Sequence, residues 1–229
     1  MREKKSKPKS STLKKTQHPL SFSPTLELEE GLGYPVVLVA GVDEVGRGCL
    51  AGPVVAGAVL LPSCVDFDAH PWLRKIHDSK KLSPQVREEL APLIHQWALA
   101  TGIGMATEAE IDQFNIFHAS HLALIRAVQA LQVKPQQILV DGKFLPKSGF
   151  AAPAVAVVKG DQKSLSIAAG SIIAKVWRDQ VMDELERKYP GYGFVTHKGY
   201  PTPAHAKALK ELGVSSVHRR SFKTVAELL

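Results

Sequence analysis

The stretch Gly41-Val42-Asp43-Glu44-Val45-Gly46-Arg47-Gly48 carries an apolar run into two acidic residues and then into a turn. Residues 36–45 have the length and composition of a buried strand, and the two glycines after them favour a turn. Residues 54–61 form a second apolar run, rich in valine and alanine, and Pro62 closes it. The spacing of the two runs predicts an antiparallel hairpin with a loop of several residues.

Outward from this hairpin, hydrophobic periodicity predicts the remaining elements. A third strand is expected at residues 99–106, and two short apolar runs, 137–140 and 155–158, each lead towards an acidic residue. Helices are expected at 84–97, after the N-cap Ser83, and at 107–111, 116–131, 164–189 and 203–212. This order favours an α/β mixed sheet, an antiparallel meander joined to parallel strands and flanked by helices. Residues from about 190 onward are predicted to form a C-terminal helical lobe.

The net charge of +7 is concentrated near the N-terminus. Residues 1–18 contain seven basic residues and one acidic residue, which leaves only +1 for the other 211 residues. We therefore expect residues 1–33 to be a basic, disordered arm and linker, and residues 34–229 to be one folded domain. The arm would either add salt-sensitive affinity for nucleic acid or be a solvated tail without a defined role.

Cysteine usage and hydropathy exclude several classes of protein. Cys49 and Cys64 have no metal-ligand spacing, which argues against a zinc ribbon or a disulfide framework and favours a reducing compartment, the cytoplasm. No apolar run reaches transmembrane length, and no apolar segment follows the basic N-terminus as in a secretory signal. We therefore expect a cytoplasmic protein without a membrane partner.

Acidic residues follow three of the predicted strands. Asp43 and Glu44 end the first strand, Asp141 follows residues 137–140, and Asp161 comes shortly after residues 155–158. Strand ends can converge at one edge of a sheet, and clustered carboxylate oxygens suit Mg²⁺ or Mn²⁺. Two such ions could activate water in phosphodiester hydrolysis.

Each acid also has a purely structural explanation. A lone aspartate at a strand end is more often a turn former, and Asp161 could cap the helix that begins near residue 164. Glu44 points to the opposite face from Asp43 if the strand stays regular. Both residues could then serve one site only after a local bend or bulge.

Seven motifs in the same order resemble those of bacterial ribonuclease HII, from about residue 36 to residue 222. They are GVDEVGRG (41–48), DSKKL (78–82), VDGK (140–143), VKGD (158–161), AAGSIIAK (168–175), HKGYPT (197–202) and HRRSF (218–222). The resemblance implies a ribonuclease H-like catalytic domain over residues 34–229, including the C-terminal lobe. The basic arm lies outside it.

The resemblance also implies an activity. By position, the family's catalytic and metal-binding carboxylates match Asp43, Glu44, Asp141 and Asp161, none of which is substituted. The implied enzyme is an endonuclease that depends on Mn²⁺ or Mg²⁺ and forms no covalent intermediate. It would hydrolyse the RNA strand of RNA–DNA hybrids, cut at ribonucleotides embedded in duplex DNA, and leave 5′-phosphate and 3′-hydroxyl ends.

Two segments are candidates for reading ribose. The backbone of Gly46, Arg47 and Gly48 could meet a 2′-hydroxyl and Arg47 could bind a phosphate, or the segment could be a hairpin turn with a solvated arginine. Tyr200 could stack on a sugar or base, or cover a neighbouring helix. The resemblance implies that the first segment contacts the 2′-hydroxyl and that Tyr200 senses the RNA-to-DNA junction.

Contacts to phosphate are less narrowly defined. Lys80, Lys81 and Lys198 are candidate substrate-binding residues that could equally be solvated lysines. Ser166 is a candidate on the helix after Asp161, where a small residue could instead pack against a sheet. The same open choice applies to Ser171 and Lys175 on that helix, and to Arg219 and Arg220, which could grip duplex backbone or be a solvated pair. His118 and His121 are expected to pack rather than to bind a metal ion.

Two other function classes compete with the nuclease. A non-catalytic nucleic-acid-binding module of the same fold would gain nothing from acids that face phosphates. A nucleotide-phosphate enzyme would need a Walker-type or dinucleotide glycine pattern, which the sequence lacks. The expected partners are RNA–DNA hybrid and ribonucleotide-containing duplex DNA. No obligate protein partner and no sliding-clamp-binding peptide are predicted, and a monomer is expected.

Overall fold

A five-stranded mixed sheet organises the computed structural model, which describes residues 24–229. The strands are β1 (Val39–Val45), β2 (Val54–Leu60), β3 (Ala100–Ala106), β4 (Gln137–Asp141) and β5 (Ala154–Val157), in the spatial order β3-β2-β1-β4-β5. β1, β2 and β3 pair antiparallel, whereas β4 pairs parallel with both β1 and β5. The predicted meander joined to parallel strands is confirmed.

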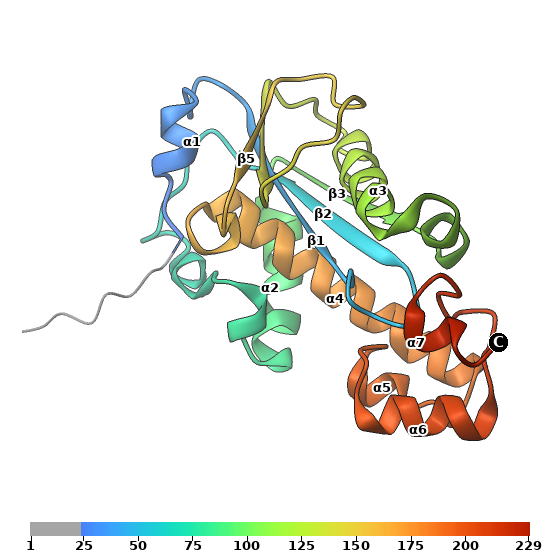
Figure 1. The fold of residues 1–229 in the computed structure, drawn as a ribbon. Coiled ribbons are helices and arrows are strands. Elements are labelled where there is room, and N and C mark those ends of the chain that lie inside the picture. Colours follow the sequence, from blue (N-terminus) through green and yellow to red (C-terminus); the bar gives the residue numbers. More distant parts are fainter. Residues whose placement is uncertain (1–23) are drawn as a thin grey trace, which may run out of the picture.

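Helices cover both faces of this sheet (Figure 1). α3 (Glu108–Gln129) packs on one face, against Ala40 and Val42 of β1 and the inward side chains of β2. α4 (Leu165–Lys188) and α2 (Pro84–Trp97) pack on the other face, around Val59. Short 3₁₀ turns at Pro71–Lys75, Ser79–Lys81 and Gly160–Gln162 lie in the connections. The alternation of β1 therefore assigns even-numbered residues to the α3 side and odd-numbered residues to the α4 side.

Glycines, which have no side chain, allow α4 to lie directly on the sheet. A Cβ atom at Gly41 would lie 2.2 Å from the backbone N of Ile167, and one at Gly57 would lie 2.4 Å from the carbonyl O of Gly170. Real Cβ atoms do not approach backbone this closely, so only glycine permits this contact. The close approach places Ser171 and Lys175 of α4 beside the end of β1.

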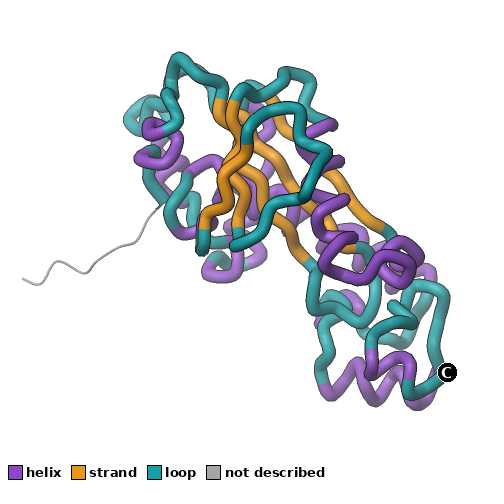
Figure 2. Tube along the Cα trace, turned by 45° about the horizontal axis from the view of Figure 1, so that its top comes forward, coloured by secondary structure: helices purple, strands orange, loops and turns teal. Residues whose placement is uncertain are grey.

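The C-terminal residues form the expected lobe at one end of the sheet. It contains α5 (Phe194–His197), α6 (Pro203–Leu212) and α7 (Lys223–Ala226), and Figure 2 shows these short helices joined by long loops. A separate apolar cluster joins the lobe to the distal end of α4 through Met182 and to the loop after β1 through Leu50. The lobe is thus packed against the same loop that carries Gly46-Arg47-Gly48.

Some boundaries differ from those expected from the sequence. Residues expected to be linker contain α1 (Glu27–Gly31), because the fully buried Glu29 carboxylate accepts hydrogen bonds from Ser164 and Ser166. β1 begins at Val39 rather than at Val36, which is 87% exposed. α3 spans the two helices expected at 107–111 and 116–131, and the backbone leaves helical geometry between them at Asn115, with φ 64° and ψ 164°, so the expected interruption is confirmed.

Two further expectations concern the basic N-terminal arm and membrane-spanning segments. The expectation of disorder for the basic arm falls on residues 1–23, outside the described residues. Within the part that the structure describes, no helix combines the length and the apolar character needed to cross a membrane.

Candidate active site

Four acids lie at the carboxyl-terminal edge of the parallel strands. Asp43 and Glu44 belong to the end of β1, Asp141 is the last residue of β4, and Asp161 lies in the 3₁₀ turn after β5. These strands are parallel, so their carboxyl ends meet at one edge of the sheet. Asp43 and Asp161 are only 3% and 4% exposed, so their carboxylates are largely removed from bulk water.

Hydrogen bonds tie these acids to the surrounding backbone. The N–H of Gly160 donates to Asp141 Oδ1 at 2.6 Å, which joins the end of β4 to the turn that carries Asp161. The N–H of Glu44 donates to Asp43 Oδ1 at 2.7 Å. Pairing between β1 and β2 keeps its register through Val45, so the bulge considered for Glu44 is absent from this pairing. Asp43 and Glu44 nevertheless line one cavity, because β4 pairs with β1 only as far as Val42 and leaves the strand end open.

The acids raise one another's pKa. Burial, followed by the charges of Glu44 and Asp141, raises the pKa of Asp43 well above its usual range. Burial also raises the pKa of Glu44 against the opposing effect of Arg47, and burial with the charge of Asp141 raises that of Asp161. Such a set of oxygen donors is stabilised by nearby positive charge.

Lys80 supplies positive charge between these acids. Its Nζ lies 3.7 Å from Asp161 Oδ2. Burial alone would lower the pKa of Lys80, but the carboxylates of Asp43, Asp161, Asp78 and Asp141 together raise it. In residues 24–229 no three His, Cys, Asp or Glu side chains converge into a ready-made metal cage. The acids nonetheless fit a hard divalent cation in donor chemistry, since all their donors are carboxylate oxygens and three of them, Asp43, Asp141 and Asp161, act on one lysine.

A cavity of about 200 Å³ joins two of the acids to the candidate ribose-reading residues. Gly46, Arg47 and Gly48 line it together with Tyr200, which is 38% exposed. Arg47 Nη1 lies 3.2 Å from Glu44 Oε1. The cavity is also lined by four residues outside the primary candidates, Val45, Ser79, Ser171 and Lys175. The hydroxyls of Ser79 and Ser171 are 2.8 Å apart, so the DSKKL segment is joined to α4 beside Asp43.

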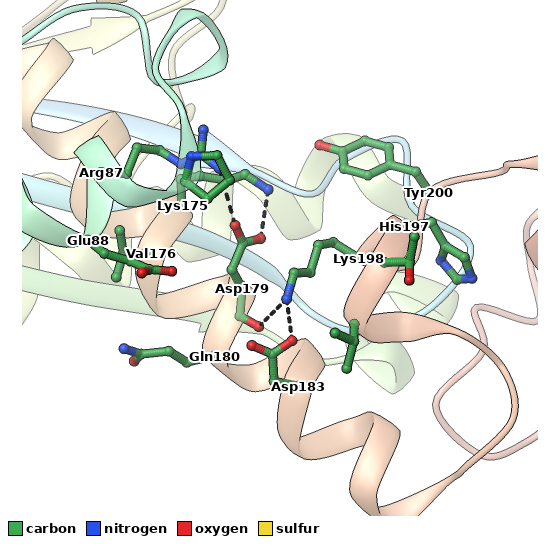
Figure 3. Close-up of a pocket in the computed structure, with 13 residues that line it drawn as sticks. Arg87, Glu88, Lys175, Val176, Asp179, Gln180, Asp183, His197, Lys198 and Tyr200 are labelled. Carbon is green, nitrogen blue, oxygen red and sulfur yellow. Dashed lines mark hydrogen bonds and ion pairs between the residues drawn. The ribbon is translucent and has the colours of Figure 1, made fainter.

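A second cavity, of about 470 Å³, adjoins the first and shares Lys175 and Tyr200 with it. Figure 3 shows Asp179 between Lys175 and Arg87, at 2.6 Å and 3.6 Å, and the ammonium group of Lys198 against Asp183. Lys198 therefore lies beside the site, but its charge is already paired with a carboxylate.

Three residues considered for substrate contact line neither cavity. Ser166 is fully buried and its hydroxyl donates to Glu29, so it joins α4 to α1 at a place that substrate cannot reach. Lys81 is exposed and lines neither cavity. Arg219 is fully buried rather than solvated or free to grip a duplex, because its guanidinium binds three backbone carbonyls. No local sequence signal marks Arg219, since its acceptors lie more than 160 positions away.

Comparison with known proteins identifies close relatives of this chain. The family model described as Ribonuclease HII matches residues 40–225. A ribonuclease HII of Nitrosococcus oceani is 55% identical over 192 residues, which are 83% of this chain and 91% of that protein. A ribonuclease HII of Ruegeria pomeroyi is 50% identical over 207 residues, 90% of this chain and 85% of that protein.

Solved structures agree with this family in fold. Ribonuclease H2 from Pyrococcus horikoshii superimposes with a TM-score of 0.70 at 31% identity, covering 83% of this chain and 96% of that one. The RNase HII in a complex with PCNA from Archaeoglobus fulgidus gives 0.68 at 30% identity, covering 82% and 96%. A Bst-RNase HIII crystallised with Mn²⁺ gives 0.59 at 20% identity, covering 84% and 69%, and shares the fold alone.

Proposed function

The chain belongs to the ribonuclease HII family and is a ribonuclease H-type endoribonuclease, and on that premise we propose its substrates and products. It cuts the RNA strand of RNA–DNA hybrids and also cuts duplex DNA at single embedded ribonucleotides. The products carry 5′-phosphate and 3′-hydroxyl ends. The observation that supports this most is one cavity that holds Asp43, Glu44, the Gly46-Arg47-Gly48 turn and Tyr200 together.

Divalent metal is the proposed cofactor, and Asp43, Glu44, Asp141 and Asp161 are the residues that would hold it. Bound Mg²⁺ or Mn²⁺ would supply an activated water and positive charge for the leaving oxygen. Lys80, with its Nζ 3.7 Å from Asp161, is placed to attract the scissile phosphate towards the acids. Lys175 lines the same cavity from α4 and would contact a neighbouring phosphate.

Recognition of ribose is assigned to the backbone of the turn and to Tyr200. The exposed turn residues Arg47 and Gly48 present peptide groups that can bond a 2′-hydroxyl, which both donates and accepts. Arg47, half exposed beside Glu44, would take a phosphate. Tyr200, which also lines the cavity, would stack on the sugar at the RNA-to-DNA junction.

A non-catalytic binding module explains the site less well. Such a module would bind phosphates more tightly without buried acids, because like charge repels the substrate and raises the pKa of each carboxyl. We further propose that the chain acts in the cytoplasm as a monomer without an obligate protein partner. The complex with PCNA concerns the Archaeoglobus protein.

Cleavage of a duplex DNA with one ribonucleotide tests the proposal. With Mg²⁺ or Mn²⁺ we expect a single cut that leaves 5′-phosphate and 3′-hydroxyl ends, and no cut with excess chelator. Asp43→Asn and Asp141→Asn should each lower the rate at least about a hundredfold, as loss of a group that stabilises the transition state does. Asp68→Asn is the matched control, since that side chain is 93% exposed and does not line the cavity. Cleavage that survives the chelator, or the Asp43→Asn and Asp141→Asn changes, would refute the assignment.

A further inference from the structure

Arg219 is a fully buried arginine whose partners are all backbone carbonyls. Its Nε donates to Gly52 O at 2.9 Å, its Nη1 to Arg47 O at 2.9 Å, and its Nη2 to Gly46 O at 2.7 Å. The ring of Phe222 lies against the guanidinium, 5.2 Å from its carbon. In the described part of the chain, no carboxylate forms an ion pair with Arg219.

These bonds determine which way two peptide groups of the turn face. In a trans peptide the C=O and the following N–H point in opposite directions. Arg219 draws the carbonyls of Gly46 and Arg47 into the interior, so the N–H groups of Arg47 and Gly48 point away from it, towards the exposed side of the turn. Neither N–H donates to any acceptor within residues 24–229. Two adjacent unpaired N–H groups beside Asp43 and Glu44 are donors available to a ligand oxygen.

Arg178, also fully buried, supports the same turn from α4. It donates to the carbonyls of Ala51, Pro53 and Lys198. Its side chain fills the space under Gly46, where a Cβ atom would lie 2.2 Å from its Nε. The bond to Lys198 O, two residues before Tyr200, connects the turn to the loop that carries the aromatic ring.

The free-energy cost of burying the Arg219 guanidinium indicates that this residue has a positioning role. A buried guanidinium without a carboxylate loses its hydration, and burial lowers the pKa of Arg219 to about 10. A buried charge is seldom the most stable way to fill a core, and apolar residues of similar volume often do better. What an apolar residue cannot do is hold three carbonyls with a rigid planar fork.

We propose that Arg219 is a positioning residue for ribose recognition: it holds the carbonyls of Gly46 and Arg47 inward so that the two following N–H groups meet the 2′-hydroxyl of the substrate. The inference rests on the proposed function, because it assumes that this turn reads ribose. It adds a residue that lies outside the cavity and never touches the nucleic acid.

Binding to two duplexes that differ by one hydroxyl tests the proposal. An Asp141→Asn background prevents cutting, and affinity is measured for a DNA duplex with one ribonucleotide and for the all-DNA duplex of the same sequence. Arg219→Lys keeps the charge but replaces the planar guanidinium with a single nitrogen, which cannot occupy the positions of Nε, Nη1 and Nη2 at once. It should lower the preference for the ribonucleotide about tenfold, the value of roughly one hydrogen bond. Affinity for the all-DNA duplex should change less than about twofold, since phosphate contacts dominate it.

Arg220→Lys is the matched control, because Arg220 is the exposed neighbour and should leave the preference unchanged. An undiminished preference in Arg219→Lys, or an equal loss of affinity for both duplexes, overturns the positioning role. If the background protein itself shows no preference for the ribonucleotide, the proposed reading of ribose by this turn fails first, and the role of Arg219 falls with it.

A measurement on the Asp141→Asn protein without any change at Arg219 covers the case in which Arg219→Lys does not fold. The amide signals of Arg47 and Gly48 are followed by NMR as each duplex is added. Both should shift further with the ribonucleotide duplex than with the all-DNA duplex. Identical shifts with the two duplexes would show that these N–H groups do not meet the 2′-hydroxyl, which overturns the proposal.

Discussion

Glu29 shows how one side chain fixes the start of the folded chain. Its Oε1 accepts from the hydroxyls of Ser164 and Ser166, at 2.6 Å and 2.7 Å, and from the N–H of Ser166 at 2.9 Å. These donors lie at the N-terminus of α4, where a negative charge is favourable. α1 is therefore attached to the helix that carries Ser171 and Lys175 into the site.

Removing this carboxylate should destabilise the whole domain. Glu29→Ala removes the acceptor shared by three buried donors. One serine hydroxyl can still donate to the other, 3.1 Å away, so two donors lose their partner and we expect the free energy of unfolding to fall by about 3 kcal/mol. Urea denaturation followed by circular dichroism measures the change. The neighbouring Glu30→Ala, at an exposed position, should alter stability by less than about 0.5 kcal/mol. Equal small effects in the two variants would mean that α1 does not contribute to the fold.

For single residues, the sequence predicts the placements that depend on neighbouring residues in the chain. Asp43, Asp141 and Asp161 follow apolar runs, and their place at strand ends follows from those runs. Ser166 and Arg219 were misplaced, because their partners lie 137 and more than 160 positions away and nothing local marks them. The catalytic roles themselves stay predictions until the carboxylates are changed.

At the scale of elements, contact between α4 and the β1–β2 pair determines the geometry of the site. The strands were predictable because alternation and apolar runs are local patterns, and the observed bounds of β2 and β3 differ from the expected ones by one residue. The close approach of α4 could not be predicted from local patterns, since it requires contact between Gly57 and Gly170, which are 113 positions apart in the chain. The interruption of α3 at Asn115, where φ is positive, falls between the two helices that the sequence predicts at 107–111 and 116–131.

A methyl group at Gly57 should separate helix from sheet. Its Cβ would lie 2.4 Å from Gly170 O and 3.0 Å from Ala174 N, both of them backbone atoms that cannot rotate away. We expect Gly57→Ala to lower the free energy of unfolding by about 3 kcal/mol. Cleavage should also slow, because Ser171 and Lys175 would move relative to Asp43.

Gly31→Ala is the control for this change. No atom lies within 4 Å of a methyl group added at Gly31, so the stability and cleavage rate of the Gly31→Ala variant should match those of the unchanged protein. Denaturation curves and single-turnover cleavage measure both quantities. A fully stable, fully active Gly57→Ala protein would show that α4 is not held by this contact.

At the scale of the whole molecule, a chain of neutral histidines connects the C-terminal lobe to the site. His218 Nδ1 accepts from the N–H of Ser215, so its proton is on Nε2, 3.2 Å from His205 Nε2. His205 then carries its proton on Nδ1, which donates to the carbonyl of Tyr200 at 3.0 Å. The chain requires both rings to be neutral, because a proton on either one places two N–H groups face to face.

Acid should therefore loosen the lobe. Burial, followed by the charge of His205, lowers the pKa of His218 from 6.5 to about 4, and burial also lowers that of His205. Between pH 6.5 and about 4 the unfolded chain binds a proton at position 218 more readily than the folded chain, so stability falls as pH falls through this window. Urea denaturation at several pH values should show this loss.

His218→Gln should be less stable at pH 7 yet lose less stability on acidification. His118→Gln, at an exposed position, should keep the pH dependence of the unchanged protein's unfolding free energy. An unchanged slope in His218→Gln would show that this ring does not couple protonation to the packing of the lobe.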